Sequence, residues 1–149
     1  MNYTFITARL ATGSKINNIQ DIQTLIKDGI THIIDCADDN DNAPLLINFP
    51  QITYLYNGTP DDGQPKSVLW FMKSLEFALP ALVLPKNKIL AHCDAGINRG
   101  PSTIYAVMRA QGYNSFLVDA LIKAARPATV FGLAYESDAD NAIKILGYD

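Results

Sequence analysis

A cysteine and an arginine separated by five residues form the most informative pattern in this chain. A thiolate is a strong nucleophile, and an arginine presents a planar fork of donors that can hold two phosphate oxygens at once. We therefore predict a loop that binds a phosphate group, with Cys93 as the nucleophile and Arg99 as the phosphate clamp. The whole run is His92-Cys93-Asp94-Ala95-Gly96-Ile97-Asn98-Arg99.

The residues around this run predict the elements that position it. Residues 88–91 are a short apolar stretch typical of a buried strand, and residues 100–102 open a helix-periodic apolar run with proline in the first turn. The loop would then lie at a helix N-terminus, where unpaired N–H groups and the helix dipole bind a dianion and favour a thiolate. We expect residues 94–99 to form a phosphate cradle.

The run from His92 to Arg99 matches the HCxxGxxR signature of the protein tyrosine phosphatase superfamily. The rest of the chain, over roughly residues 5 to 128, resembles the small dual-specificity branch. The flanking likenesses are Ile6 to Ser14, Gly29 to Asp35, and Arg126-Pro127. The resemblance implies a cysteine-dependent phosphatase that works through a phosphocysteine intermediate, in which His92 orders the loop through hydrogen bonds.

The resemblance also implies a general acid, an aspartate on a loop some thirty residues before the cysteine. Asp61 and Asp62 are the candidates, in a segment with Pro60 and Gly63 that suits a mobile loop. Alignment on the following helix favours Asp61 and leaves Asp62 as the alternative. This carboxyl group would protonate the leaving oxygen and then activate water against the phosphocysteine.

The chain departs from the family pattern directly after the arginine. The family usually has a serine or threonine there, whose hydroxyl bonds the cysteine sulfur, whereas this chain has Gly100. Ser102 is two residues further on and points elsewhere on a helix. We expect slow hydrolysis of the phosphocysteine unless a water or Asn98 substitutes, and the variant Gly100→Ser would test this.

The second cysteine, Cys36, has two interpretations. It ends a predicted central strand, where a small buried residue is ordinary. In some members of the family, a cysteine at this place forms a protective disulfide with the catalytic one. Cys36 is therefore a possible redox partner of Cys93, and peroxide treatment should decide between the two roles.

The alternation of elements predicts one α/β domain over residues 1–149. We expect three layers, with a central, mostly parallel sheet flanked by helices. Ser137 and Asp140 form a predicted capping box for the last helix, and Tyr54 is assigned to the core. The expected strands lie within 3–12 and at 30–36, 52–56 and 89–92, and the helices at 19–27, 67–79, 115–125 and 137–146, besides the helix after the loop.

Composition and charge narrow the function classes. The net charge of −3 argues against general nucleic-acid binding. No stretch approaches the length of a membrane span and no secretion signal begins the chain, so the expected location is cytoplasmic and no membrane partner is expected. We expect no cofactor and no metal, because two histidines and two distant cysteines give zinc little to bind. Asp38, Asp39 and Asp41 are interpreted as a solvated acidic loop that could shape the substrate mouth.

The expected substrates are phosphotyrosine, phosphoserine and phosphothreonine proteins, with small phosphomonoesters open. Phosphoinositides are disfavoured, because their polyanionic head would meet Asp94 rather than a cation. An RNA 5′-triphosphatase is an alternative, since such enzymes can also carry asparagine before the arginine, as Asn98 does here. A catalytically weak phosphate-binding pseudophosphatase is a second alternative, and a rhodanese-type sulfurtransferase fits the HCxxGxxR spacing poorly.

Overall fold

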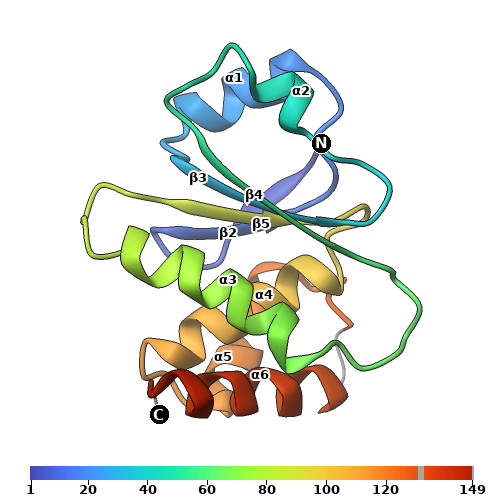
Figure 1. The fold of residues 1–149 in the computed structure, drawn as a ribbon, viewed down its shortest axis with the longest axis vertical. Coiled ribbons are helices and arrows are strands. Elements are labelled where there is room, and N and C mark those ends of the chain that lie inside the picture. Colours follow the sequence, from blue (N-terminus) through green and yellow to red (C-terminus); the bar gives the residue numbers. More distant parts are fainter. Residues whose placement is uncertain (131–132, 149) are drawn as a thin grey trace.

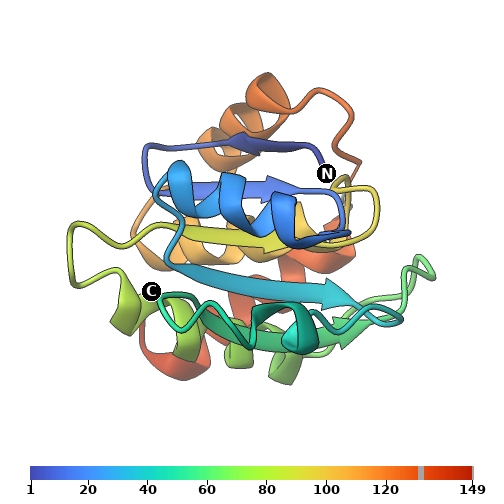
Figure 2. The same ribbon diagram turned by 90° about the horizontal axis from the view of Figure 1, so that it is seen from above.

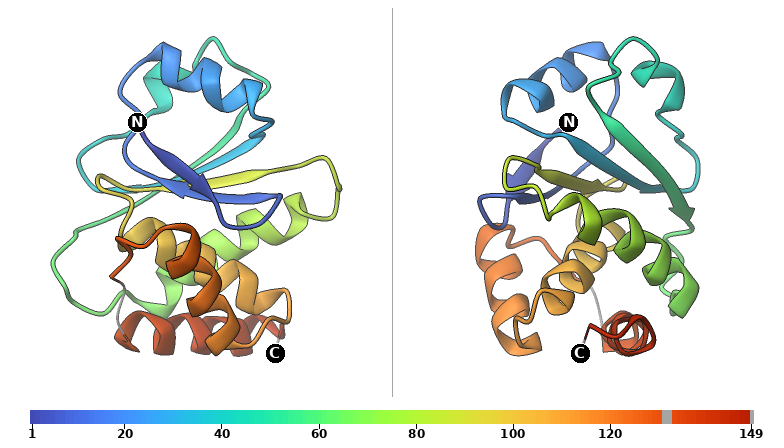
Figure 3. Two further views of the ribbon diagram at one scale, coloured as in Figure 1. Left: turned by 180° about the vertical axis from the view of Figure 1, so that it is seen from behind. Right: turned by 60° about the vertical axis from the view of Figure 1, so that its left-hand side comes forward.

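The computed structural model describes residues 1–130 and 133–148, and these form a layered α/β arrangement (Figure 1). The helices α1 and α2 cover one face of a central sheet, and α3, α4, α5 and α6 cover the other (Figures 1 and 3). The strands are β1 (Tyr3–Phe5), β2 (Leu10–Gly13), β3 (His32–Ala37), β4 (Thr53–Thr59) and β5 (Ile89–His92). The helices are α1 (Ile19–Lys27), α2 (Ala43–Leu46), α3 (Val68–Ala81), α4 (Arg99–Ala110), α5 (Ser115–Ala125) and α6 (Leu133–Leu146).

The strands make one sheet in the order β1-β2-β5-β3-β4 (Figure 2). The pairs β2–β5, β5–β3 and β3–β4 are parallel, and β1 is antiparallel to β2 at the edge. The predicted three-layer fold with a mostly parallel sheet is confirmed. Because parallel neighbours end at the same edge of a sheet, the loops that follow β3, β4 and β5 are brought together there.

The helix α4 is the centre of the helical layer. Every residue of α4 except Arg109 is buried, and the helix contacts α3, α5 and α6 as well as the sheet. A helix buried on most sides needs no polar face, and the residues from Ile104 to Met108 are accordingly apolar or aromatic, whereas the buried polar residues Arg99, Ser102 and Thr103 lie in its first turns beside the phosphate loop. All four residues of β5 are buried too. The loop between β5 and α4 is therefore anchored at both ends in the core.

Two details of the sequence prediction are wrong. The helix α6 begins at Leu133 rather than near Ser137, so Ser137 and Asp140 lie inside it and form no capping box. Asp140 instead accepts a hydrogen bond from Arg109 Nε at 3.1 Å, and this contact with α4 has no local signature in the sequence. The short helix α2, which carries a proline at its start, was not predicted.

The helix lengths bear on whether the chain could cross a lipid bilayer. Within the described residues, none has the length and apolar character needed to cross a membrane.

Candidate active site

The predicted phosphate loop lies between β5 and α4, as the sequence suggests. Cys93 is almost fully buried, and its backbone N–H donates to the Gly13 carbonyl at 3.2 Å. The backbone N–H of Gly100, in the first turn of α4, donates to Cys93 Sγ at 3.4 Å. The helix N-terminus therefore directs a backbone donor at the sulfur.

Two features hold the loop in its cradle shape. Gly96 has φ +71°, and a Cβ there would lie 2.5 Å from the carbonyl carbon of Gly13, so only glycine fits. The buried Arg126 donates to the Gly96 carbonyl at 2.5 Å and to the Ala95 carbonyl at 3.2 Å. These carbonyl groups are thereby directed to Arg126. In the sequence Arg126 is only a family marker, and nothing local indicates this contact.

Arg99 is buried beneath the mouth of the loop and faces several acceptors. Its Nη1 donates to the Thr59 carbonyl at 2.8 Å and lies 3.4 Å from Asp38 Oδ1, and its Nη2 lies 3.5 Å from Asp94 Oδ2. Burial alone would lower the pKa of Arg99. The negative charges of Cys93, Asp61, Asp94 and Asp38 outweigh burial and hold that pKa above its ordinary value. The guanidinium is therefore a permanent cation.

Asp61 and Asp62 point to different partners. Asp61 Oδ1 accepts a hydrogen bond from Asn98 Nδ2 at 3.1 Å, across to the phosphate loop. Asp62 is paired with Lys66 at 2.9 Å and accepts from the backbone N–H of Gln64 at 3.0 Å. The Lys66 hydrogen bond is the main reason that the pKa of Asp62 lies below its usual value. The geometry brings Asp61, and not Asp62, to the loop that carries Cys93.

Lys66 also shapes the segment on which Asp61 stands. Its Nζ donates to the Pro60 carbonyl as well as to the Asp62 carboxylate, and so contacts the residues on both sides of Asp61. Lys66 is not recognisable as a site residue in the sequence, because a lysine in an acidic loop carries no specific signal. The two contacts close the loop after β4 into a compact turn.

The fold of the whole chain is similar to that of several solved structures. No family model matches the chain. The structure of PTPMT1 in complex with PI(5)P superposes with a TM-score of 0.82 at 13% identity, over 97% of this chain and 96% of that one. DUSP15 gives 0.77 at 23% identity, over 95% and 86%. The human tyrosine phosphatase-like serine/threonine/tyrosine-interacting protein gives 0.76 at 25% identity, over 97% of both chains.

The chain has the protein tyrosine phosphatase fold. The resemblance to the dual-specificity branch, predicted from the phosphate loop, is confirmed by these neighbours.

His92 lies at the end of β5 in this phosphatase fold, inside the core. It has no exposed surface, and burial is the main cause that lowers the pKa of His92 to about 4. The backbone of Cys93 opposes this shift and the charge of Arg99 adds to it. His92 Nε2 lies 3.6 Å from Asp35 Oδ1, and at neutral pH the imidazole is uncharged. Neither ring nitrogen has a hydrogen-bond partner among the described residues, so the expected ordering of the loop by His92 hydrogen bonds stays a prediction.

Asp35 belongs to a buried polar cluster that the sequence analysis missed. It is fully buried on β3, and burial is the main cause that raises the pKa of Asp35 to about 6. Tyr54 donates to Asp35 Oδ2 at 2.8 Å and lies 2.7 Å from Asp41 Oδ1, and the backbone N–H of Asn42 donates to the Tyr54 hydroxyl. Tyr54 was predicted as core, and its hydroxyl in fact connects β3 to the acidic loop.

The thiol of Cys36 also lies in the core of the phosphatase fold. Cys36 Sγ is 3.4 Å from the hydroxyl oxygen of Thr103, and burial raises the pKa of this thiol far above its ordinary value. Its backbone carbonyl lies 3.5 Å from Arg99 Nη1, so the strand that carries it reaches the site. A pairing with Cys93 stays a prediction.

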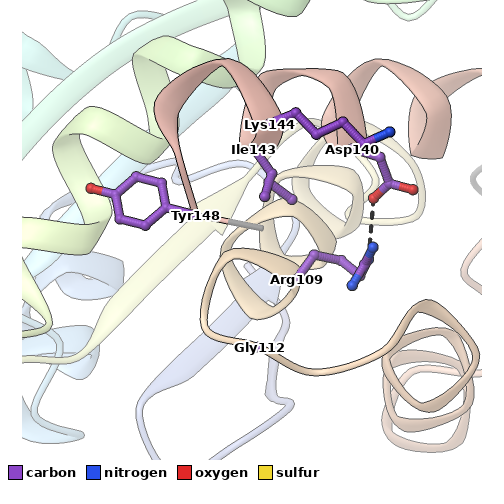
Figure 4. A pocket seen from close by; sticks show the side chains of 6 residues that line it. All are labelled: Arg109, Gly112, Asp140, Ile143, Lys144 and Tyr148. Atoms are coloured by element: carbon purple, nitrogen blue, oxygen red, sulfur yellow. Dashed lines mark hydrogen bonds and ion pairs between the residues drawn. The ribbon is translucent and has the colours of Figure 1, made fainter.

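A separate hollow lies between α4 and α6 at the other end of the helical layer (Figure 4). It sits near the C-terminal end of α4, roughly 15 Å along that helix from the phosphate loop at 1.5 Å per residue. Of its two cationic side chains, Arg109 and Lys144, Arg109 is paired with Asp140. Its lining residues include no member of the phosphate loop and no cysteine. They are Arg109, Gly112, Asp140, Ile143, Lys144 and Tyr148.

Proposed function

We propose that this protein is a cysteine-dependent phosphatase that hydrolyses phosphomonoesters, and that residues 1–149 are one catalytic domain. The observation that carries the proposal is the bond between Asp61 and Asn98, because it holds a candidate acid against the loop that contains Cys93 and Arg99. A nucleophile, an oxyanion clamp and a proton donor converge on one loop. This combination is what phosphoryl transfer through a covalent intermediate requires.

In the first step, the Cys93 thiolate attacks phosphorus. A sulfur–phosphorus bond forms while the bond from phosphorus to the leaving oxygen breaks, and Asp61 gives that oxygen a proton. Arg99 holds two equatorial oxygens of the phosphoryl group, and its contacts with Asp38 and Asp94 then yield to the phosphate. The backbone N–H groups of residues 94–99 supply the remaining donors.

In the second step, water replaces the cysteine. Asp61, now a carboxylate, takes a proton from the water, whose oxygen attacks phosphorus. The sulfur–phosphorus bond breaks and returns the electron pair to Cys93, and inorganic phosphate leaves. The N–H of Gly100 donates to the departing sulfur, as it does in the resting structure.

Phosphorylated proteins, or small phosphomonoesters, are the substrates we propose. The carboxylates of Asp38 and Asp94 lie within 3.5 Å of the Arg99 guanidinium and would repel additional phosphate groups on a substrate. This charge disfavours polyanionic lipids and RNA 5′-triphosphates, although a neighbour at 13% identity was solved with PI(5)P. A substrate with one phosphate and a neutral or basic surrounding fits best.

A phosphate-binding module without turnover is the second candidate. Because residue 100 is glycine, it offers the Cys93 sulfur no side-chain hydroxyl. One structural neighbour is the tyrosine phosphatase-like serine/threonine/tyrosine-interacting protein, whose name describes an interaction rather than a hydrolysis. Steady-state hydrolysis of p-nitrophenyl phosphate by wild type and Cys93→Ser, together with binding of a phosphotyrosine peptide to both, separates the two. Turnover that disappears in the variant supports the enzyme, whereas binding without any turnover by wild type supports the module.

A further inference from the structure

Asn98 stands at the N-cap of α4, yet its side chain does not cap that helix. Asparagine is strongly preferred at this position because its side-chain oxygen accepts a hydrogen bond from a first-turn N–H. Asn18 and Asn114 do this at α1 and α5, at 2.9 and 2.8 Å. The amide of Asn98 forgoes the capping bond, and the free energy it would contribute, so another role must account for its orientation.

Both hydrogens of the Asn98 amide have acceptors. Nδ2 donates to Asp61 Oδ1 at 3.1 Å and to the Tyr135 hydroxyl at 3.2 Å. Oδ1 is buried and has no partner among residues 1–130 and 133–148. The opposite orientation of the amide would set its oxygen against the Asp61 carboxylate, so the carboxylate determines which atom faces it.

Tyr135 gives this contact a rigid support. It is 6% exposed and stands in the first turn of α6, a helix that packs on α3 and α4 through Ala139, Ala142 and Ile143. The phenol oxygen is therefore fixed relative to the core, and the amide of Asn98 is held between it and Asp61. Three segments that are far apart in sequence meet at one amide: the loop after β4, the phosphate loop and α6.

We propose that Asn98 and Tyr135 are positioning residues that hold Asp61 in the geometry for proton transfer, an inference that rests on the proposed function. A general acid must present the oxygen that carries its proton to the leaving group. The amide N–H occupies Oδ1 of Asp61 and leaves Oδ2 for the proton. Asp61 itself is exposed on its loop, so the link to Asn98 and Tyr135 supplies the order that burial does not.

The leaving group of the substrate distinguishes positioning of the acid from any other role. A nitrophenolate leaves without a proton, whereas a phenolate needs one, so loss of the general acid slows phenyl phosphate far more than p-nitrophenyl phosphate. We would measure kcat/KM on both substrates for wild type, Asp61→Asn, Asn98→Ala and Tyr135→Phe. The ratio that we follow is kcat/KM for p-nitrophenyl phosphate divided by kcat/KM for phenyl phosphate. General acid catalysis contributes about 100-fold or more, so Asp61→Asn should raise this ratio by about that factor.

The expected rise in this ratio is about tenfold for Asn98→Ala and smaller for Tyr135→Phe, since both leave the acid present but less ordered. Asn114→Ala is the matched control, because it removes an asparagine that does cap its helix and should lower stability without changing the ratio. Tyr135→Phe lies outside the phosphate loop and provides the test if Asn98→Ala does not fold.

An unchanged ratio in Asn98→Ala and Tyr135→Phe, beside a raised ratio in Asp61→Asn, would overturn the positioning role and leave the proposed phosphatase intact. An unchanged ratio in all three would overturn the role of Asp61 as well. Failure of the phosphatase itself has a different signature, which is either no hydrolysis of p-nitrophenyl phosphate by wild type or hydrolysis that survives in Cys93→Ser, and either result would overturn the positioning role as well.

Discussion

The hydroxyl oxygen of Thr12 lies 2.8 Å from the position that a Cβ on Gly100 would occupy. The Ala91 carbonyl oxygen lies 2.9 Å from the same position, so the first turn of α4 is pressed against β2 and β5. Thr12 is fully buried, and its hydroxyl has no partner within the described residues. A side chain does not fit at Gly100, and the sulfur of Cys93 receives a backbone N–H instead of a hydroxyl.

We therefore expect Gly100→Ser to destabilise the fold rather than improve turnover. The new Cβ would meet backbone at less than 3 Å, and such overpacking costs about 1–3 kcal/mol. Urea unfolding measures the loss, and Gly100→Ala is the control because it adds the Cβ without a hydroxyl. Equal losses in both variants would identify the Cβ as the cause, whereas a stable Gly100→Ser with faster turnover would contradict the packing argument.

The proton on Asp35 should make stability depend on pH. In the folded protein the pKa of Asp35 is raised to about 6, above its value in the unfolded chain. The protonated form therefore stabilises the fold fully below the unfolded pKa, and this stability is lost as the pH rises through 6. The loss corresponds to about 3 kcal/mol. Asp35→Asn stays uncharged and can donate to Tyr54. We expect its stability relative to wild type to be higher at pH 8 than at pH 4.5.

Urea unfolding of wild type and Asp35→Asn at both pH values checks this expectation. The comparison with the variant is needed because His92 has the opposite dependence: its lowered pKa means that stability is lost as pH falls from about 6.5 towards 4. A difference between the two proteins that does not change with pH would show that Asp35 titrates normally.

The two carboxylates beside Arg99 should set a charge preference. Asp38→Asn and Asp94→Asn each remove one negative charge within 3.5 Å of the guanidinium, on a side chain that is less than half exposed at Asp94 and at Asp38. We expect each variant to lower KM for a phosphopeptide with acidic flanks by roughly threefold, with less change for basic flanks, since exposed charge pairs interact weakly. The effect should shrink at high salt. Asp39→Asn is the control, as no contact with Arg99 involves it.

The redox role of Cys36 can be tested by oxidation. Peroxide treatment followed by peptide mapping should yield a linked Cys36–Cys93 peptide if the two thiols pair, and Cys36→Ala should then become irreversibly inactivated faster than wild type. Burial raises the pKa of the Cys36 thiol, so peroxide should oxidise Cys93 rather than Cys36 to a sulfenic acid. The Cys36 sulfur would then attack the sulfur of Cys93, and water would leave as the disulfide forms. Sulfinic acid on Cys93 in wild type, without a linked peptide, would contradict the pairing.

Most of the fold follows from local sequence patterns. The helices α1 and α5 and the strand β5 have the predicted bounds, because the apolar pattern that defines each of them lies within the segment itself. The helix α1 is also preceded by the cap Asn18 and followed by Gly29, which has a positive φ. The start of α6 was misplaced because Ser137 and Asp140 mimic a cap. The earlier turn contains the buried Tyr135, whose hydroxyl accepts a hydrogen bond from Asn98 of the phosphate loop, and a local pattern does not contain such a contact.

The candidate site also has one part that is visible in the sequence and another part that only the folded chain reveals. The phosphate loop is one continuous run, so its residues and spacing are visible in the sequence. Asp61 and Asp62 differ by partners that come from Asn98 on one side and Lys66 on the other, and only the folded chain separates them. The cluster of Asp35, Tyr54 and Asp41 joins two strands and a loop, and each of its members alone has an ordinary interpretation.

The central claim is that Cys93 carries the phosphoryl group during turnover. The most direct measurement is the intact mass of the protein after acid quench during hydrolysis of an aryl phosphate, for wild type and for Cys93→Ser. We expect one added phosphoryl group on wild type, mapped to Cys93, and neither adduct nor turnover in the variant. Turnover by wild type with no adduct, or turnover that persists in Cys93→Ser, would contradict it.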